Sequence, residues 1–279
     1  AAVRAATDQA RGYARAVLAS HPGDARGEEL LGLYWFTAAT RLRGPATASA
    51  WDSAAAHLRA AVLGDPQLAS AWNSLSIVLQ AQGDHAGAVA ALQRAVDADA
   101  YLRNDARTTN RMVFTQLFAG QGDAARATCA RARPHFPPTT FVAGCDLAVL
   151  GWIGRGPRDV ASSWEALRRV ERDGSWGKVA GISPEGRFYV AAVLARSGLA
   201  DSARALVRAT RAALVGAGAP DEATTNEAAV HVLLGDRDAA LAALERTVRG
   251  NPGAVAQITA LPWFLPLRGD PRYERLVAR

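Results

Sequence analysis

The sequence predicts an all-α protein built as a stack of about six helical hairpins that ends in a C-terminal cap. Two observations predict this fold class. Apolar and small residues recur at helical spacing, and turn signals interrupt them at intervals of roughly 34–40 residues. Alanine also supplies much of the 49% hydrophobic fraction, and its small side chain suits helices that approach closely. Because a lone hairpin cannot bury its apolar face, we expect one continuous right-handed solenoid over residues 1–279.

The segment 66–100 carries the clearest hairpin pattern. Large apolar residues share one face of a first helix and mostly small ones share one face of a second, at Trp72, Leu75, Leu79, Ala88, Leu92 and Ala95. Gly83-Asp84 lies between the two helices, where glycine provides left-handed backbone at a helix end. We therefore expect a hairpin over 67–99, with Trp72 packed between its helices.

The same alternation predicts further hairpins on both sides. They span about 25–63, 103–133, 139–172, 184–214 and 221–249, with turns at Arg43-Gly44-Pro45, Gly122-Asp123, Gly154-Arg155-Gly156-Pro157, Gly198 and Gly235-Asp236. Residues 1–22 form an incomplete first repeat or an N-terminal helix, which favours a chain whose N-terminal part lies outside this sequence. Residues 253–279 cap the stack, with Trp263 filling a gap. The glycine-rich stretch 173–183 is expected to be a loop, in which Trp176 either fills a gap or anchors an interface.

These hairpins resemble tetratricopeptide (TPR) repeats over roughly 20–250, most closely at 66–100 and 221–252. The tail at 234–246 and 264–276 resembles the C-terminal end of bacterial TPR modules, which often follow a serine/threonine kinase, an adenylate cyclase or a winged-helix regulator domain. The resemblance implies a TPR-like α-α superhelix whose first helices line a concave face. It also implies a protein-interaction module, often part of a larger polypeptide, and transfers no enzyme activity.

The sequence shows no pattern for a catalytic, metal or cofactor site. The histidines lack His-Glu-x-x-His spacing, no Gly-x-Ser-x-Gly elbow stands out, and the stretch around Lys178 lacks the strand and the Ser/Thr of a phosphate loop. We therefore expect no enzyme activity, no cofactor and no metal. The formal net charge is +6 and every basic residue except Lys178 is arginine, but acidic residues are interspersed, so nucleic-acid binding is not favoured. A GC-rich genome or an arginine surface for phosphate or carboxylate would each explain the arginines.

Neither the cysteines nor the apolar stretches point to a particular compartment. Cys129 and Cys145 are expected to be small buried hydrophobes, and a disulfide between them is the alternative. No run of 18 apolar residues suggests a membrane span. No signal-peptide pattern is visible, which favours the cytoplasm, although the compartment stays open because the chain begins with alanine.

Residues on the predicted first helices are the candidates for binding a protein or peptide partner. They are Asn73, Ile77, Gln80, Arg107, Asn110, Arg111, Met112 and Phe188. An arginine beside an asparagine can pair with a carboxylate of the partner. The alternative is a solvated face, since polar residues must lie somewhere, and core packing for Phe188.

The sequence thus predicts a protein- or peptide-binding TPR scaffold or adaptor without catalytic activity of its own. Two alternatives stay open. The chain is a regulatory or sensory segment of a larger signalling protein, or it is a structural subunit of a multiprotein assembly. The sequence does not identify the partner.

Overall fold

The computed structural model describes residues 2–41, 45–103, 105–136, 141–173, 178–179, 181–251 and 254–278. These residues form helices joined by turns, with one isolated antiparallel bridge between Val179 and Ile182. The predicted all-α class is therefore confirmed. The chain divides into two compact units, Ala1–Thr108 and Thr109–Arg279. A single continuous solenoid stays a prediction, and each unit is described by itself.

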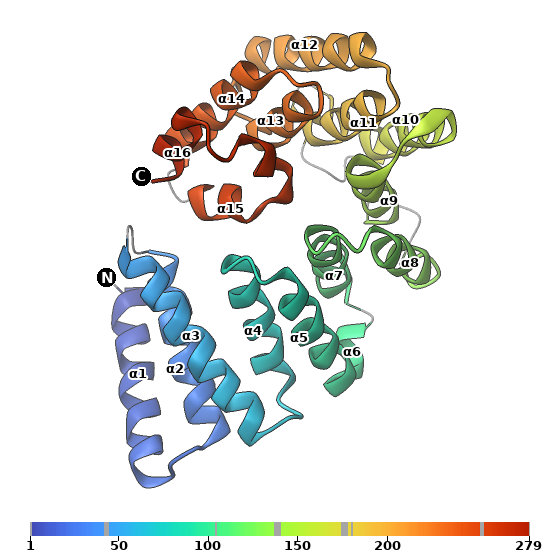
Figure 1. The fold of residues 1–279 in the computed structure, drawn as a ribbon. Coiled ribbons are helices and arrows are strands. Elements are labelled where there is room, and N and C mark those ends of the chain that lie inside the picture. The colour runs from blue at the N-terminus through green and yellow to red at the C-terminus, as the bar shows by residue number, and fades with distance from the viewer. Residues whose placement is uncertain are drawn as a thin grey trace. The chain divides into compact units, whose positions relative to one another are not determined.

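The first unit is a series of helices in which each packs against the next (Figure 1). They are α1 (Ala2–Ser20), α2 (Ala25–Ala39), α3 (Pro45–Gly64), α4 (Ala69–Ala81), α5 (His85–Ala98) and the short α6 (Ala100–Arg103). The predicted core positions of the 67–99 hairpin are buried, at Leu75, Leu79, Ala88, Leu92 and Ala95. Trp72 is half-buried against this core, and its indole Nε1 donates to the backbone carbonyl of Pro66 at 2.9 Å. The hairpin pattern is therefore confirmed.

Two glycines of the first unit occupy positions where a side chain would strain the backbone or clash with a neighbouring helix. Gly83 has φ +80° in the turn between α4 and α5, and the following Asp84 caps α5 by accepting from the Gly87 N–H at 2.9 Å. Gly32 lies on α2 where a Cβ would come within 2.6 Å of Leu58 Cγ on α3. The close approach of α2 and α3 therefore depends on the missing side chain.

The second unit continues the paired helices and ends in shorter elements. They are α7 (Ala106–Phe118), whose first turn crosses the boundary, α8 (Gly122–Ala132), α9 (Phe141–Ile153), α10 (Gly156–Asp173), α11 (Pro184–Arg196), α12 (Ala200–Gly216), α13 (Thr224–Leu233), α14 (Arg237–Gly250), α15 (Ala254–Ala260), the 3₁₀ helix η1 (Pro262–Leu267) and α16 (Pro271–Val277). Each of α9, α11 and α13 packs against its own partner helix, and α11 also packs against both α9 and α13. Contact between successive first helices is how stacked hairpins share one core.

The turn before α8 lies two residues earlier than the sequence predicts. Gly120 has φ +72°, and its N–H donates to the carbonyl of Leu117 at 3.0 Å. Gly122 is instead the first residue of α8, where a Cβ would come within 2.7 Å of Ile153 Cγ2. The prediction of a Gly122-Asp123 turn is therefore wrong, because the left-handed glycine is Gly120, two residues after the last residue of α7.

The C-terminal elements complete the core of the second unit. η1 packs against α13, and α16 packs against α14. Their buried side chains belong to the main core, at Phe264, Leu267, Tyr273 and Leu276. The Trp263 ring stacks on Trp152 with 4.0 Å between ring centroids, as expected of a gap-filling residue. Trp176 lies outside the described residues. Among the described helices, none has the length and apolarity needed to cross a bilayer.

Cys129 on α8 and Cys145 on α9 form a disulfide, with 5.8 Å between their Cα atoms. Both are buried, as expected, but the expectation of free thiols is wrong. The sequence shows two isolated cysteines, and only the packing of α8 against α9 brings them within bonding distance.

Candidate functional site

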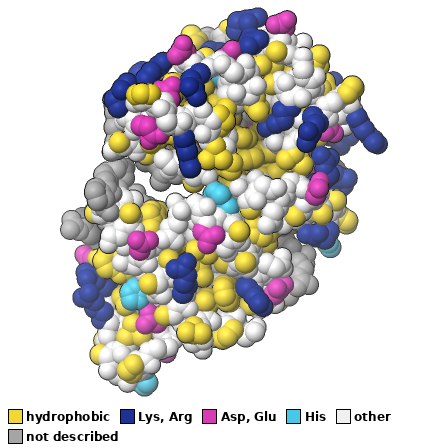
Figure 2. Space-filling model, in the orientation of Figure 1, with side chains coloured by type: hydrophobic (Ala, Val, Ile, Leu, Met, Phe, Trp, Pro, Cys, Tyr) yellow, Lys and Arg dark blue, Asp and Glu magenta, His cyan; other side chains and the backbone are white. Residues whose placement is uncertain are grey.

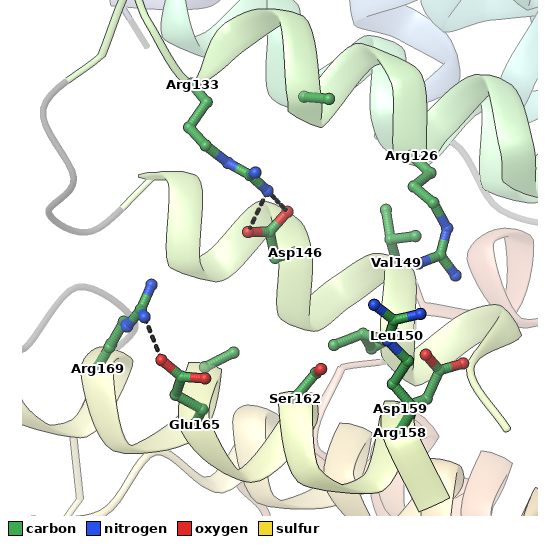
Figure 3. Close-up of a pocket in the computed structure, with 12 residues that line it drawn as sticks. Arg126, Arg133, Asp146, Val149, Leu150, Arg158, Asp159, Ser162, Glu165 and Arg169 are labelled. Carbon is green, nitrogen blue, oxygen red and sulfur yellow. Dashed lines mark hydrogen bonds and ion pairs between the residues drawn. The ribbon is translucent and has the colours of Figure 1, made fainter. Parts of the chain in front are cut away.

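A hollow of about 550 Å³ lies on the second unit between α8, α9 and α10 (Figure 3). We call it the α8–α10 groove. It is lined by Arg126, Ala130, Arg133, Asp146, Val149, Leu150, Arg158, Asp159, Ser162, Glu165, Ala166 and Arg169. The side chains of Val149, Leu150 and Ala166 are buried and form an apolar floor, whereas the arginines of the walls are exposed. The groove therefore combines an apolar base with charged edges.

Helical periodicity places these residues on one side of each helix. On α8, Arg126, Ala130 and Arg133 follow one another at spacings of four and three, while the adjoining face buries Ala125 and Cys129. The disulfide from Cys129 holds α8 against α9, and so links one wall of the groove to its floor.

The other wall comes from α10, which is polar on its outer face. Its groove residues Arg158, Ser162 and Arg169 recur at helical spacing, and the buried Leu167 and Val170 face the core instead. Gly156 precedes them with φ +82°, at the point where the chain turns from α9 into α10.

Ion pairs neutralise one end of the groove. The Arg133 guanidinium donates from Nη2 to both carboxylate oxygens of Asp146, at 2.9 Å each. Arg169 pairs with Glu165 one turn before it on α10. Both pairs are half-exposed, so their contribution to folding stability is small. Their effect is to leave this end of the groove without net charge.

The other end of the groove carries net positive charge, because Arg126 and Arg158 line it against the single carboxylate of Asp159 (Figure 3). Arg126 and Arg158 point into the groove from opposite walls, over Val149 and Leu150 (Figure 3). Within the described parts of the chain neither forms an ion pair with a carboxylate. Asp159 caps its own helix, because its Oδ2 accepts from the backbone N–H of Arg155 at 2.9 Å.

The sequence-predicted binding residues fall into three groups. Asn73, Ile77 and Gln80 are half-buried on α4, and Arg107 is exposed at the start of α7, all in the first unit. Asn110 is exposed and Arg111 is half-buried on the part of α7 that belongs to the second unit. The expected face thus draws on both units, and it stays a prediction.

Met112 and Phe188 are core residues. Met112 is 6% exposed and Phe188 is 1% exposed, and Phe188 packs among Ala192, Val207 and Val230. A side chain buried to this degree offers no surface to a partner unless the helices separate. We therefore correct the expectation that these two residues contact a partner.

A separate network of charges lies inside the second unit. Glu227 on α13 is 5% exposed and accepts from Arg211 of α12 and, at 2.7 Å, from Arg246 of α14. Nearby on α11, burial raises the pKa of Glu185, and the Asn226 and Tyr189 side chains oppose this only in part. The pairs of Glu227 connect α13 to α12 and α14, so we assign this network a structural role.

The groove residues were not among the sequence-predicted site residues. The sequence feature that could have indicated the groove is the repetition of arginine on one face of α8 and of α10, each of which is the second helix of its hairpin. That signal is weak, because arginine is nearly the only basic residue of the chain and occurs on most helices. On the face that Figure 2 shows, basic and acidic side chains are interspersed with apolar ones, and neither sign forms a continuous band.

Comparisons with known proteins give structural likeness at low identity. No protein-family model and no curated protein matches the sequence. Similar solved structures include the APC/C hetero-tetramer Cut9–Hcn1, with a TM-score of 0.47 and 14% identity over 91% of this chain and 46% of that chain. YrrB, described as a TPR protein with an unusual peptide-binding site, gives a TM-score of 0.38 and 16% identity over 73% of this chain and 96% of that chain.

The complex of Naa15/Naa10 bound to HypK-THB gives a TM-score of 0.38 and 14% identity, over 90% of this chain and 36% of that chain. The chain spans about half the length of the Cut9–Hcn1 chain it matches. The paired helices, the left-handed turn glycines and, in the second unit, the contacts between successive first helices are features of stacked helical hairpins.

Proposed function

We propose that the chain is a non-catalytic scaffold that binds a protein or peptide, and that the α8–α10 groove is one of its binding surfaces. The observation that carries this proposal is the apolar floor of Val149 and Leu150 between charged walls. Protein interfaces have the same organisation, with an apolar centre and a polar rim. The volume of about 550 Å³ also falls within the range of roughly 300–1,000 Å³ that ligand pockets occupy.

The chemistry of the groove supports binding rather than catalysis. Its carboxylates already have partners: Asp146 pairs with Arg133, Glu165 pairs with Arg169, and Asp159 caps α10. General acid–base catalysis needs a carboxyl group or histidine that is positioned toward a substrate and has a perturbed pKa. None of the described residues that line the groove is a histidine.

A regulatory segment of a larger signalling protein is the alternative proposal. It is supported by the resemblance of residues 264–276 to the ends of TPR modules that follow kinase, cyclase or winged-helix domains. A scaffold and a regulatory segment would both bind a protein. The two proposals differ in which domains the gene encodes next to this chain. Sequencing the complete gene separates them, because an adjoining catalytic or DNA-binding domain would favour the regulatory role.

A groove-filling variant tests the proposed function. Ala130 is exposed within the groove, whereas Ala127 is exposed on α8 outside it. Ala130→Trp should therefore block the groove, and Ala127→Trp should add the same side chain without blocking it. Each variant and the wild type are used to capture proteins from a lysate of the source cells, with quantitative mass spectrometry as the readout. We expect specific partners to be recovered by wild type and Ala127→Trp and lost from Ala130→Trp. Equal recovery by both variants would contradict the proposal.

A further inference from the structure

Arg126 and Arg158, which form no ion pair among the described residues and outnumber the one carboxylate beside them, Asp159, define which charge the groove would accept. Arg126 and Arg158 extend over an apolar floor from opposite walls. Two like charges over a low-dielectric surface produce a positive potential, which an anionic group placed between them would relieve. Guanidinium groups also bind carboxylates in a bidentate geometry. This end of the groove is therefore complementary to an acidic group.

The opposite end of the groove has a different preference. There Arg133 is held by Asp146, and Arg169 is held by Glu165, so an incoming acid would meet carboxylates as well as guanidinium groups. An acidic ligand gains less at this end than beside Arg126 and Arg158. The ligand should therefore place its acidic residues at one end of the groove and apolar side chains on Val149 and Leu150.

The lining residues favour a peptide over a nucleic acid. Single-stranded nucleic acids are held by aromatic side chains on which bases stack, and none of the described residues that line this groove is aromatic. Asp146 and Glu165 would also repel a phosphate backbone that ran along its length. A peptide can instead alternate carboxylates with apolar side chains, which matches the charged walls and the apolar floor.

We propose that the α8–α10 groove binds an acidic, leucine-containing peptide segment whose carboxylates are held by Arg126 and Arg158. This inference rests on the proposed function of the groove as a binding surface. It goes further by naming the chemistry of the ligand and the two side chains that recognise its charge.

Labelled synthetic peptides test the inference with the full chain. The first probe repeats Asp-Glu-Leu-Leu, the second replaces the acids with Asn and Gln, and the third replaces them with Lys and Arg. A single-stranded oligonucleotide with the same label is the fourth probe. Fluorescence anisotropy measures the dissociation constant of each probe at low and moderate salt. We expect only the acidic peptide to bind, and more weakly at moderate salt.

Charge variants then locate the binding. Arg126→Gln combined with Arg158→Gln should weaken binding of the acidic probe about tenfold to a hundredfold. Arg168→Gln removes an exposed arginine of α10 that does not line the groove, and it should leave binding nearly unchanged. Asp146→Asn releases Arg133 from its ion pair, so it should tighten binding of the acidic probe several-fold. A purely structural role of Asp146 would not produce that gain.

Four results would overturn the inference. The neutral peptide binds as tightly as the acidic one, the oligonucleotide binds more tightly than either, Arg168→Gln weakens binding as much as the double variant does, or no probe binds. The proposed function is judged separately by Ala130→Trp and Ala127→Trp. Suppose that partner capture is lost only in Ala130→Trp while the acidic and neutral peptides bind equally well. That combination would support the groove as a binding surface and would contradict the proposal that Arg126 and Arg158 recognise acidic residues.

Discussion

Trp72 is the residue through which the hairpin pattern of the first unit is most easily tested. It is half-buried against the core of α3, α4 and α5, and its indole donates to the Pro66 carbonyl. Trp72→Ala removes this packing and the hydrogen bond. We expect it to lower the free energy of unfolding by about 3 kcal/mol, the lower end of the range for truncating a packed tryptophan. Denaturant unfolding, followed by far-ultraviolet circular dichroism, measures the change.

Asn73→Ala is the matched control for that experiment. Asn73 is the next residue on α4 and is half-buried, but it is not part of the apolar core. Asn73→Ala leaves the apolar packing of α4 in place, so it should lower the free energy of unfolding by less than Trp72→Ala does. If Asn73→Ala destabilised the protein more than Trp72→Ala, the assignment of the packing face on α4 would be wrong.

Glu185 makes stability depend on pH in a defined direction. Burial raises its pKa above the ordinary value of 4.5, so the folded protein holds this proton to a higher pH than the unfolded chain does. The unfolded state therefore binds fewer protons between the two pKa values, and stability falls as the pH rises through that interval. Glu185→Gln removes this partly buried charge, and we expect a higher melting temperature than wild type at neutral pH.

The difference between Glu185→Gln and wild type should vanish below the unfolded pKa, where Glu185 is protonated in both states. Melting temperatures across the acid and neutral range check this. Glu245→Gln, which changes a half-exposed carboxylate on α14, serves as the control. A wild type that gains stability relative to Glu185→Gln as the pH rises would show that the partly buried carboxylate is stabilised in its charged form.

At the scale of elements, the disulfide ties α8 to α9 and so fixes two sides of the groove. Cys129 and Cys145 are 16 residues apart, and closing a loop of this length contributes about 3 kcal/mol to the free energy of unfolding. We expect a loss of that size in the second unit after reduction, or in the double variant Cys129→Ala with Cys145→Ala. Urea unfolding with and without reductant measures it. Identical unfolding curves, with two free thiols found by mass spectrometry, would contradict the pairing.

The helices themselves could be predicted because each carries its own signal. Buried positions of α5 recur at Ala88, Leu92 and Ala95, and Gly83 in the turn before it lies two residues after the end of α4. Before α8 the sequence has two glycines, Gly120 and Gly122, and the local pattern does not show which one takes the left-handed conformation. The sequence therefore predicts the turn at Gly122, whereas it lies at Gly120. The distinction depends on Ile153, which belongs to another helix and leaves no space for a side chain at Gly122.

At the scale of the whole molecule, the packing of helices against one another determines which residues are exposed, and the sequence pattern does not show this. Phe188 has the helical position expected of a surface anchor, yet α12 and α13 cover it. The groove is likewise invisible in any one helix, because Arg126 and Arg158 belong to different hairpins and meet only after folding. Fold class is encoded locally, whereas the candidate site depends on the packing of three helices.

The sequence-predicted face and the groove are competing locations for the binding surface. The first includes Asn73 and Arg107 in the first unit, and the second lies wholly within α8, α9 and α10 of the second unit. A ligand slows amide hydrogen exchange where it orders the backbone, so exchange distinguishes the two locations without any substitution.

Hydrogen–deuterium exchange of the full chain, with and without the acidic leucine-containing peptide, tests the central claim most directly. If the groove binds this ligand, exchange should slow in α8, in α10 and in the described part of α9, while α4 stays unchanged. Slower exchange around Asn73 and Arg107, with α8 and α10 unchanged, would place the binding surface on the sequence-predicted face and contradict the assignment of the groove.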